Sequence, residues 1–300
     1  MKVIRTIAEL RQELSLMRKN QAIRSGEAVV GLVPTMGYLH QGHASLMQAA
    51  RQQSDIVVLS IFVNPIQFGP NEDFDSYPRD EERDVETART EGVDIVFIPS
   101  VQEMYPQPTQ TTIAVSGITE RLCGASRPGH FNGVTTVVSK LFNIVQPQKA
   151  FFGMKDAQQV AVIQQMVHDL NMPIDIVPCP IVREEDGLAL SSRNVYLSTE
   201  LREEALVLSQ ALRAAQEAVD SGAAVTADDI RRLLREHIGT AAHAVIDYAE
   251  IQAFPSLEPL AGDEPLQAYE DLLIALAVKF GKTRLIDNMR IQKMEVLSLV

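Results

Sequence analysis

The segment VVGLVPTMGYLHQGH, residues 29–43, decides the fold. Its first six residues form an apolar run that ends in a proline and is soon followed by a glycine, as expected of a buried strand leading into a turn. A second apolar run, DIVVLSIFV at residues 55–63, is rich in β-branched residues and predicts a strand covered on both faces. A helical apolar pattern at residues 43–53 joins the two runs. This strand–helix–strand order is typical of a parallel sheet.

The same alternation continues through the first half of the chain. Further strands are expected at residues 93–99, 149–152 and 174–180, and helices at residues 80–91, 133–145 and 156–170. We therefore predict an α/β fold with a Rossmann-like, doubly wound parallel sheet.

The pattern changes after about Pro180. Helices are expected at residues 199–222 and 227–238, the second capped by Thr226, and strands at residues 245–253 and 272–280. These elements predict a smaller α+β domain, which divides the chain into residues 1–178 and 179–300.

The composition is that of a globular protein. The 300 residues are 46% apolar and 22% charged, and 39 acidic residues against 27 basic ones give a net charge of −12. An acidic surface repels nucleic-acid phosphates, so nucleic-acid binding is disfavoured. Any anionic ligand would need a locally positive site.

Targeting signals are not evident in the sequence. The N-terminus alternates charged and apolar residues, and the apolar runs are too short to span a membrane. Cys123 and Cys179 lack metal-ligand spacing and are expected to be buried and reduced. We expect a cytoplasmic protein that does not bind membranes.

The turn after the first strand carries His40, Gly42 and His43. In a doubly wound sheet ligands bind beyond the carboxyl ends of the strands, where a helix N-terminus favours phosphate. Gly42 would let the backbone approach a ligand, and the two imidazoles could reach the same phosphate oxygens. A helix cap and a metal site are the alternatives; the metal site would need a third ligand, which the local sequence does not supply.

A second polar cluster follows the expected domain boundary, in GLALSSRN at residues 187–194. Ser191, Ser192 and Arg193 can bind phosphate oxygens, with the guanidinium acting as a forked donor. A surface turn is the alternative interpretation. Together, the two clusters resemble the HxGH and KMSKS-like pair of the nucleotidylyltransferase superfamily. There is no GxxxxGK[ST] motif for the P-loop mode of ATP binding.

Further motifs narrow the resemblance. They are FVNPIQF (62–68), YPR (77–79), RPGHFNGV (127–134), FGMKDAQQ (152–159) and GKTRLIDN (281–288). In this order and spacing they resemble the motifs of pantothenate synthetases, over about residues 1–288. Residues 289–300 look like an extension with no assigned role.

The resemblance implies a reaction. Pantoate and ATP would form an enzyme-bound pantoyl adenylate and pyrophosphate, and β-alanine would then attack the adenylate to give pantothenate and AMP. Mg²⁺ would accompany ATP, and the protein would be a homodimer. No covalent nucleophile is required, because the carboxylate of pantoate attacks the α-phosphorus.

The resemblance also assigns residues. The pantoate pocket would comprise Pro34, Met36, Phe62, Asn64, Gln67, Tyr77 and Gln159. The ATP site would comprise Met36, His40, Gly42, His43, Gly153, Lys155, Asp156, Val182, Ser191, Ser192 and Arg193. The catalytic residues would be His40, His43, Lys155 and Arg193, with His43 as the proton donor. Amide side chains suit pantoate because they can both donate to and accept from its hydroxyls.

Three residues of these motifs have other interpretations. Asp156 could simply cap a helix, and His130 could be a structural histidine. Met154 stands where a more polar residue is expected, so its backbone could matter more than its side chain.

Two rival functions stay open. A nucleotidylyltransferase that acts on a phosphorylated substrate would need additional basic residues in the acid pocket. A non-catalytic nucleotide-binding domain would not need both phosphate motifs together with a complete acid pocket.

Overall fold

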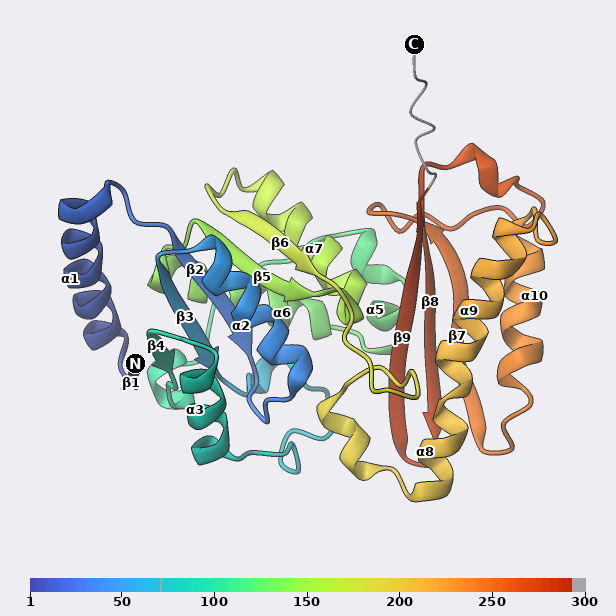
Figure 1. Ribbon diagram of the computed structural model, residues 1–300, viewed down its shortest axis with the longest axis horizontal. Helices are drawn as coiled ribbons and strands as arrows, with labels where there is room; N and C mark the ends of the chain where they lie inside the picture. Colours follow the sequence, from blue (N-terminus) through green and yellow to red (C-terminus); the bar gives the residue numbers. More distant parts are fainter. Residues whose placement is uncertain (71, 293–300) are drawn as a thin grey trace, which may run out of the picture.

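The structure is a computed structural model that describes residues 1–70 and 72–292. Figure 1 shows two sheets side by side, with helices packed around each. The last expected segment, residues 289–300, is described only as far as Gln292; the remainder lies outside the described residues.

The first sheet is parallel and has six strands in the order β1-β4-β3-β2-β5-β6. Its strands are β1 (Lys2–Ile4), β2 (Val30–Thr35), β3 (Ile56–Ile61), β4 (Ile95–Phe97), β5 (Lys149–Gly153) and β6 (Asp175–Cys179). From β2 the chain first adds strands on one side and later, with β5, on the other. The carboxyl ends of β2 and β5 therefore form the switch point at which such sheets bind ligands. The predicted α/β class and doubly wound sheet are confirmed.

Helices cover both faces of this sheet. One core lies between the sheet and α1 (Ile7–Ser25), α6 (His130–Val145) and α7 (Ala157–Asp169). A second core on the opposite face includes residues of α2 (Gln41–Gln53) and α3 (Glu81–Thr90). Helices on both faces explain why β3 is buried at all six positions and reads as a continuous apolar run. The short helices α4 (Val101–Met104) and α5 (Cys123–Ser126) complete this half.

The second sheet is antiparallel, in the order β7-β8-β9. Its strands are β7 (Ala244–Ala253), β8 (Asp271–Phe280) and β9 (Thr283–Gln292). One face packs on α9 (Val207–Asp220) and α10 (Ala227–Ile238), while Leu273 and Ala275 of β8 belong to the core of the first sheet. The middle strand β8 is thus covered on both faces, and its side chains are buried from Leu272 to Val278.

Several elements differ from the sequence predictions. The helix expected at 199–222 is two helices, α8 (Thr199–Ala205) and α9, which meet at Leu206. The helix expected at 133–145 begins three residues earlier, at His130. The sequence interpretation missed β1, α1 and β9. By contrast, α10 has the predicted bounds, and Thr226 caps it by accepting from the N–H of Asp229 at 3.3 Å.

The two cysteines are buried and unpaired, as the sequence predicts. In a separate respect, none of the helices within residues 1–70 and 72–292 is both long and apolar enough to cross a membrane.

Candidate active site

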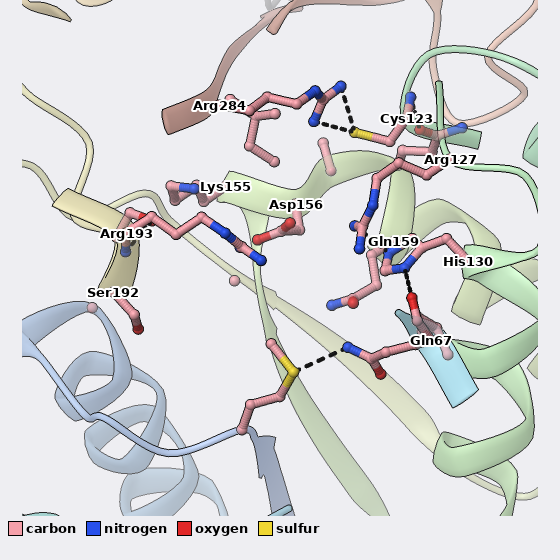
Figure 2. A pocket seen from close by; sticks show the side chains of 18 of the residues that line it. Gln67, Cys123, Arg127, His130, Lys155, Asp156, Gln159, Ser192, Arg193 and Arg284 are labelled. Atoms are coloured by element: carbon pink, nitrogen blue, oxygen red, sulfur yellow. Dashed lines mark hydrogen bonds between the residues drawn. The ribbon is translucent and has the colours of Figure 1, made fainter. Parts of the chain in front are cut away.

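One cavity of about 1090 Å³ opens at the switch point of the parallel sheet and extends to the antiparallel sheet. Its lining includes every site residue predicted from the sequence. These residues are Pro34, Met36, His40, Gly42, His43, Phe62, Asn64, Gln67, Tyr77, Gly153, Lys155, Asp156, Gln159, Val182, Ser191, Ser192 and Arg193. Figure 2 shows how side chains from several elements converge on it.

His40 caps α2 and His43 lies in its first turn, and backbone N–H groups of this turn orient both rings. Nδ1 of His40 accepts a hydrogen bond from the N–H of Gly42 at 3.1 Å, and Nδ1 of His43 accepts from the N–H of His40 at 3.3 Å. The two rings lie 4.1 Å apart. Because both Nδ1 atoms accept, the ring hydrogen of each neutral imidazole is assigned to Nε2. Both histidines therefore cap the helix and still keep one N–H donor each.

Both imidazoles are neutral near pH 7. Burial lowers the pKa of His40 to about 4, helped by the positive charges of Lys155 and Arg83. Burial lowers the pKa of His43 to about 3, helped by His40 and Lys155. A neutral ring can donate a hydrogen bond without carrying a charge of its own. An anion bound beside them would favour the protonated forms and raise both pKa values.

Gly42 is required for a reason that the sequence did not reveal. A Cβ atom at this position would lie 2.9 Å from Cε1 of His40. Any other residue would therefore push the His40 ring out of its place. The close approach of the Gly42 backbone to a ligand remains a prediction, and its N–H is already used by His40.

The loop before His40 is held by a buried carboxylate on α3. Asp84 is 1% exposed and accepts hydrogen bonds from the N–H groups of Tyr38 at 2.7 Å and Leu39 at 2.6 Å. Burial raises the pKa of Asp84, although these two hydrogen bonds oppose the shift. The guanidinium of Arg83 donates to the carbonyl of Leu39 at 3.2 Å. Two neighbouring residues of α3 thus fix the approach to the histidine turn.

Lys155 and Asp156 lie in η3 (Met154–Asp156), a short 3-10 helix after β5. Nδ2 of Asn288, on β9, donates to the carbonyls of Met154 at 2.8 Å and Lys155 at 2.9 Å. The Met154 side chain is buried, so at this position only the backbone is engaged in a polar contact. Among the described residues, no carboxylate pairs with Lys155, which leaves its ammonium free for a ligand.

The cap interpretation of Asp156 is wrong, because its side chain makes no cap hydrogen bond to α7. The carboxylate is exposed at the cavity instead.

The SSRN segment forms η4 (Ser192–Tyr196) and faces the histidine turn. Arg193 makes a bidentate ion pair with Asp73, at 3.0 Å from Nε and 2.9 Å from Nη2, and lies over the Tyr77 ring. Ser191 Oγ accepts from the N–H of Arg193, and Ser192 Oγ donates to the carbonyl of Tyr38 at 3.4 Å. The surface-turn alternative does not describe this segment, which packs into the cavity wall.

The acid pocket contains two amide side chains, Asn64 and Gln67, that differ in how fully they are hydrogen-bonded within the protein. Nδ2 of Asn64 donates to Oε1 of Gln67 at 3.2 Å and to the carbonyl of Gly133, while its Oδ1 accepts from the hydroxyl of Tyr105 at 2.8 Å. Asn64 therefore has its hydrogen-bonding groups engaged within the protein and orients Gln67. Among the described residues, Nε2 of Gln67 has only Met36 Sδ as a partner, at 3.0 Å (Figure 2). Sulfur is a weak acceptor, so this N–H₂ group can serve a ligand.

The helix α6 forms one wall of the acid pocket. A Cβ atom at Gly133 would lie 2.5 Å from Cα of Gln67, so glycine is needed where this helix touches η1 (Pro65–Gln67). Apolar side chains of α6 then face the cavity; they are Phe131, Val134, Val137, Val138 and Leu141. Together with Pro34, Met36 and Phe62, they give the pocket an apolar wall suited to a small branched acid.

His130 is structural. Its Nδ1 lies 2.8 Å from the carbonyl of Gln67, and its Nε2 lies 3.0 Å from Nη1 of Arg127. The carbonyl can only accept, so Nδ1 carries the hydrogen. Arg127 is in turn paired with Glu72 through two hydrogen bonds. This series of contacts, from Glu72 through Arg127 and His130, fixes the backbone carbonyl of Gln67.

A family model described as pantoate-beta-alanine ligase matches residues 2–290. The chain belongs to the pantoate–β-alanine ligase family. It is 56% identical over 292 residues to a pantothenate synthetase of Acetivibrio thermocellus, with 97% of this chain and all of that protein covered. It is 58% identical over 274 residues to the pantothenate synthetase of Geobacillus thermodenitrificans, with 91% and 92% covered.

Solved structures agree with this assignment. The pantothenate synthetase of Thermus thermophilus superposes with a TM-score of 0.88 at 45% identity, covering 96% of this chain and 99% of that one. The pantoate–β-alanine ligase of Francisella tularensis, solved in complex with beta-gamma ATP and β-alanine, has a TM-score of 0.75 at 33% identity, with 96% and 97% covered.

In this member of the pantoate–β-alanine ligase family, the sequence interpretation missed the residues that hold the site together. They are Asp73, Asp84, Glu72, Arg183, Asp287 and Asn288. Some of them lie within or close to the motifs that resemble the family. Their partners are far away in the chain, so local sequence does not indicate these contacts.

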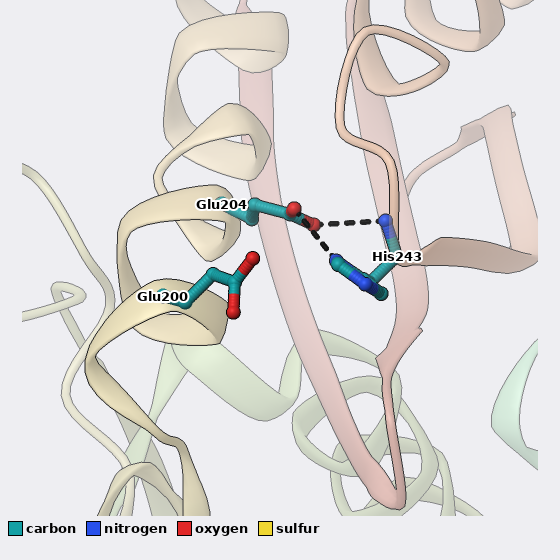
Figure 3. A group of neighbouring side chains, drawn as sticks. All are labelled: Glu200, Glu204 and His243. Carbon is teal, nitrogen blue, oxygen red and sulfur yellow. Dashed lines mark hydrogen bonds and ion pairs between the residues drawn. The ribbon is translucent and has the colours of Figure 1, made fainter.

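A cluster outside the cavity consists of Glu200, Glu204 and His243 (Figure 3). Oε1 and Oε2 of Glu204 lie 2.8 Å from Nδ1 and 2.9 Å from the backbone N of His243. The hydrogen bond with Glu204 raises the pKa of His243. The ion pair joins α8 to the start of β7, and this structural role accounts for its geometry.

Proposed function

We propose that this protein condenses pantoate with β-alanine to give pantothenate, with ATP converted to AMP and pyrophosphate. The decisive observation is that the histidine turn, the SSRN segment and an apolar pocket with the amides of Gln67 and Gln159 line one cavity, in a chain that belongs to the pantoate–β-alanine ligase family. The protein is thus a ligase that forms an amide bond.

The first step is adenylylation of pantoate. A carboxylate oxygen of pantoate attacks the α-phosphorus of ATP, and the bond to the β-phosphate breaks with release of pyrophosphate. We propose that Gln67 and Gln159 hold the hydroxyls and carboxylate of pantoate, while Pro34, Met36 and Phe62 contact its methyl groups. Asn64 and Tyr77, placed in the same pocket from the sequence, would act by supporting Gln67 and Arg193.

The phosphate chain needs donors on the side away from this pocket. We propose that Lys155, Arg193, Ser191 and Ser192 bind the β- and γ-phosphates, and that His40 and His43 donate Nε2–H hydrogen bonds to the phosphates as charge develops. The ring of His43 is neutral near pH 7, so it carries no additional proton to transfer. In its proposed role as proton donor it would therefore first donate a hydrogen bond from Nε2–H to a phosphate oxygen. Gly153, Asp156 and Val182 would contact the ribose and adenine.

The second step joins the two halves of the product. The neutral amine of β-alanine attacks the carbonyl carbon of the adenylate; the C–N bond forms, the C–O bond to phosphate breaks, and AMP leaves. The amine proton passes to solvent or to the departing phosphate. The enzyme contributes mainly by placing the amine beside the carbonyl.

The carboxylates of the cavity differ in whether they are free to bind Mg²⁺. Glu72, Asp73, Asp247 and Asp287 are each paired with an arginine. Asp156 is the remaining carboxylate of the described cavity lining and has no such partner. Mg²⁺ in nucleotide sites is held by phosphate oxygens, water and one or two carboxylates, so Asp156 is the residue that would hold it. The ion would neutralise phosphate charge.

Three further features stay predictions, the homodimer from the family resemblance and the other two from sequence patterns. We propose a homodimer, a cytoplasmic location and a division into domains at residues 1–178 and 179–300. The end of β6 at Cys179, before all strands of the second sheet, supports the division. Sedimentation equilibrium of the purified protein tests the dimer.

The central experiment measures pyrophosphate and AMP. With ATP, Mg²⁺ and pantoate, the protein should release pyrophosphate; addition of β-alanine should then give AMP and pantothenate over many turnovers. A protein that releases no pantoate-dependent pyrophosphate would refute the proposal. Replacement of pantoate by a phosphorylated acid tests the rival nucleotidylyltransferase function, which predicts faster turnover with the phosphorylated substrate.

A further inference from the structure

The hairpin between β8 and β9 brings a second group of positive charges to the cavity. Lys279, Lys282 and Arg284 all line it, and Asp247 is the carboxylate that pairs with Arg284. Within residues 1–70 and 72–292, neither lysine has an ion-pair partner. Three cations against one anion form a local excess of positive charge in a chain whose net charge is −12. Such an excess favours an anionic ligand.

The guanidinium of Arg284 is held in place by an ion pair, but some of its N–H donors have no strong acceptor among the described residues. Its Nε and Nη2 donate to Oδ2 of Asp247 at 2.9 and 2.7 Å, and it lies 5.6 Å from the centre of the Tyr248 ring. In the described part of the chain, Nη1 donates a hydrogen bond to Cys123 Sγ, at 3.6 Å. A guanidinium has five N–H donors and sulfur is a weak acceptor. The group is therefore held in one orientation with donors left for a planar anion.

Arg127 is the neighbouring arginine in Figure 2, and it does not offer the same opportunity. Its guanidinium makes a bidentate ion pair with Glu72 and a contact of 3.0 Å with His130. Both arginines use Nε and Nη2 for a carboxylate, and they differ in the partner of Nη1. Nη1 of Arg127 meets a ring nitrogen of His130, whereas Nη1 of Arg284 meets a weakly accepting sulfur and is the more available donor.

The position of this corner separates it from the acid pocket. Arg284 and Cys123 lie on one side of the cavity and Gln67 on the other, with Asp156 between them (Figure 2). Lys155 and Arg193 lie to a third side, with Ser192. A ligand held by Arg284 therefore approaches the centre of the cavity from a direction used neither by pantoate nor by the proposed phosphate donors.

We propose that Arg284, in the field of Lys282 and Lys279, binds the carboxylate of β-alanine and so selects this amine as the acceptor. This inference rests on the proposed function. The amine of β-alanine lies two methylene groups from its carboxylate, so a fixed anchor for the carboxylate directs the amine toward the adenylate. An amine that lacks the carboxylate gains nothing from the guanidinium and is discriminated against.

The test compares two acceptors in the full-length enzyme. β-Alanine and its neutral amide, β-alaninamide, present the same amine, so the ratio of their kcat/KM values measures what the carboxylate contributes. Arg284→Gln should lower that ratio roughly 10- to 100-fold, the effect of losing hydrogen bonds to a charged group. Arg284→Lys should retain part of the preference. Lys282→Ala should lower the ratio in the same direction by a smaller factor, and serves if Arg284→Gln does not fold.

The matched control is Arg235→Gln, on an exposed face of α10, where Arg235 pairs with Glu250. Its ratio should equal that of the wild type. An unchanged ratio in Arg284→Gln, with a raised KM for ATP, would overturn the proposal and assign the guanidinium to a phosphate. Pantoate-dependent exchange of pyrophosphate into ATP by the wild type, measured without β-alanine, tells this failure apart from failure of the proposed function.

Discussion

The parallel and the antiparallel sheet contribute to one cavity in different ways. The parallel sheet supplies the turns after β2 and β5, which carry His40, His43 and Lys155. The antiparallel sheet stabilises the turn after β5, because Asn288 of β9 donates to two backbone carbonyls of η3. The comparison shows that the predicted phosphate contacts and the contacts that orient them are encoded in separate halves of the chain.

The same strand also reaches the segment that leads to the second predicted phosphate element, SSRN. Asp287 is 2% exposed and makes a bidentate ion pair with Arg183, at 2.6 and 2.8 Å. Arg183 begins the short hairpin that leads to the SSRN segment, where it bridges to Ala189. Two neighbouring residues of β9 thus connect Lys155 on one side with Arg193 on the other.

The largest effect is expected from the parallel side. Lys155→Ala removes a cation that has no ion-pair partner in the described part of the protein, so its charge is available to the triphosphate. We expect pantoate-dependent pyrophosphate release to fall by roughly 10²- to 10³-fold, as for a lost transition-state contact. Lys149→Ala, at the start of β5 and outside the cavity, is the control. Wild-type turnover in Lys155→Ala would remove this residue from the phosphate site.

The next effect tests the antiparallel side. Asn288→Asp replaces the donor to Met154 and Lys155 by an acceptor that faces two carbonyls. We expect kcat for pyrophosphate release to fall roughly 10- to 100-fold, because a broken buried hydrogen-bond pair costs about 2 kcal/mol. Asn143→Asp is the matched control, since that amide donates to Ser139 within α6. Equal rates for Asn288→Asp and the wild type would show that β9 does not orient η3.

A smaller effect distinguishes binding from chemistry within the parallel half. Gln67→Ala removes an amide whose N–H₂ group meets only a sulfur atom. We expect the KM for pantoate to rise about tenfold, with a smaller change in kcat, from the loss of one hydrogen bond to a charged ligand. Gln102→Ala, at an exposed position on α4, should leave both constants unchanged. A kcat effect without a KM effect would argue that Gln67 acts in the transition state instead.

The last test measures stability instead of a rate or binding constant, so it stands outside the order of the kinetic effects. Burial lowers the pKa values of His40, His43 and His130 to about 4, 3 and 4, from an ordinary 6.5. The unfolded chain therefore binds protons between pH 6.5 and 4 that the folded chain does not. The free energy of unfolding should fall as the pH is lowered through this window, by up to about 1.4 kcal/mol per pH unit for each histidine.

Guanidinium denaturation at pH 7 and pH 5 measures this slope. His130→Gln should flatten it, because one of the three groups is lost. His168→Gln, at an exposed position on α7, should not change it. Identical slopes in all three proteins would contradict the assignment.

The sequence predicted those elements that carry a strong pattern. The apolar runs of β2 and β3 mark strands because both faces are covered, and α10 has an amphipathic pattern with a capping threonine. The helix α1 was missed although it carries a helical signal: Thr6 caps it, and Ile7, Leu10, Leu14 and Met17 recur at helical spacing on the side that packs on the core. The strand β9 was quoted as a motif, and its charged and amide residues hid its alternation.

The site was predicted as a set of residues and not as a set of contacts. Motif resemblance brought together residues that line one cavity. It could not show that Arg193 pairs with Asp73, 120 positions away, or that Asn288 reaches Met154 across 134 positions. Such pairs depend on how the two sheets meet, and no local spacing encodes that.

The place of Asn288 on the last described strand has a consequence for synthesis of the chain. On the ribosome, both phosphate motifs and the whole parallel sheet emerge well before β9. A nascent chain can therefore form the fold around β2 and β5 while the turn that carries Lys155 still lacks its two hydrogen bonds from Asn288. The completed cavity therefore requires that β9 has emerged and paired with the rest of the fold.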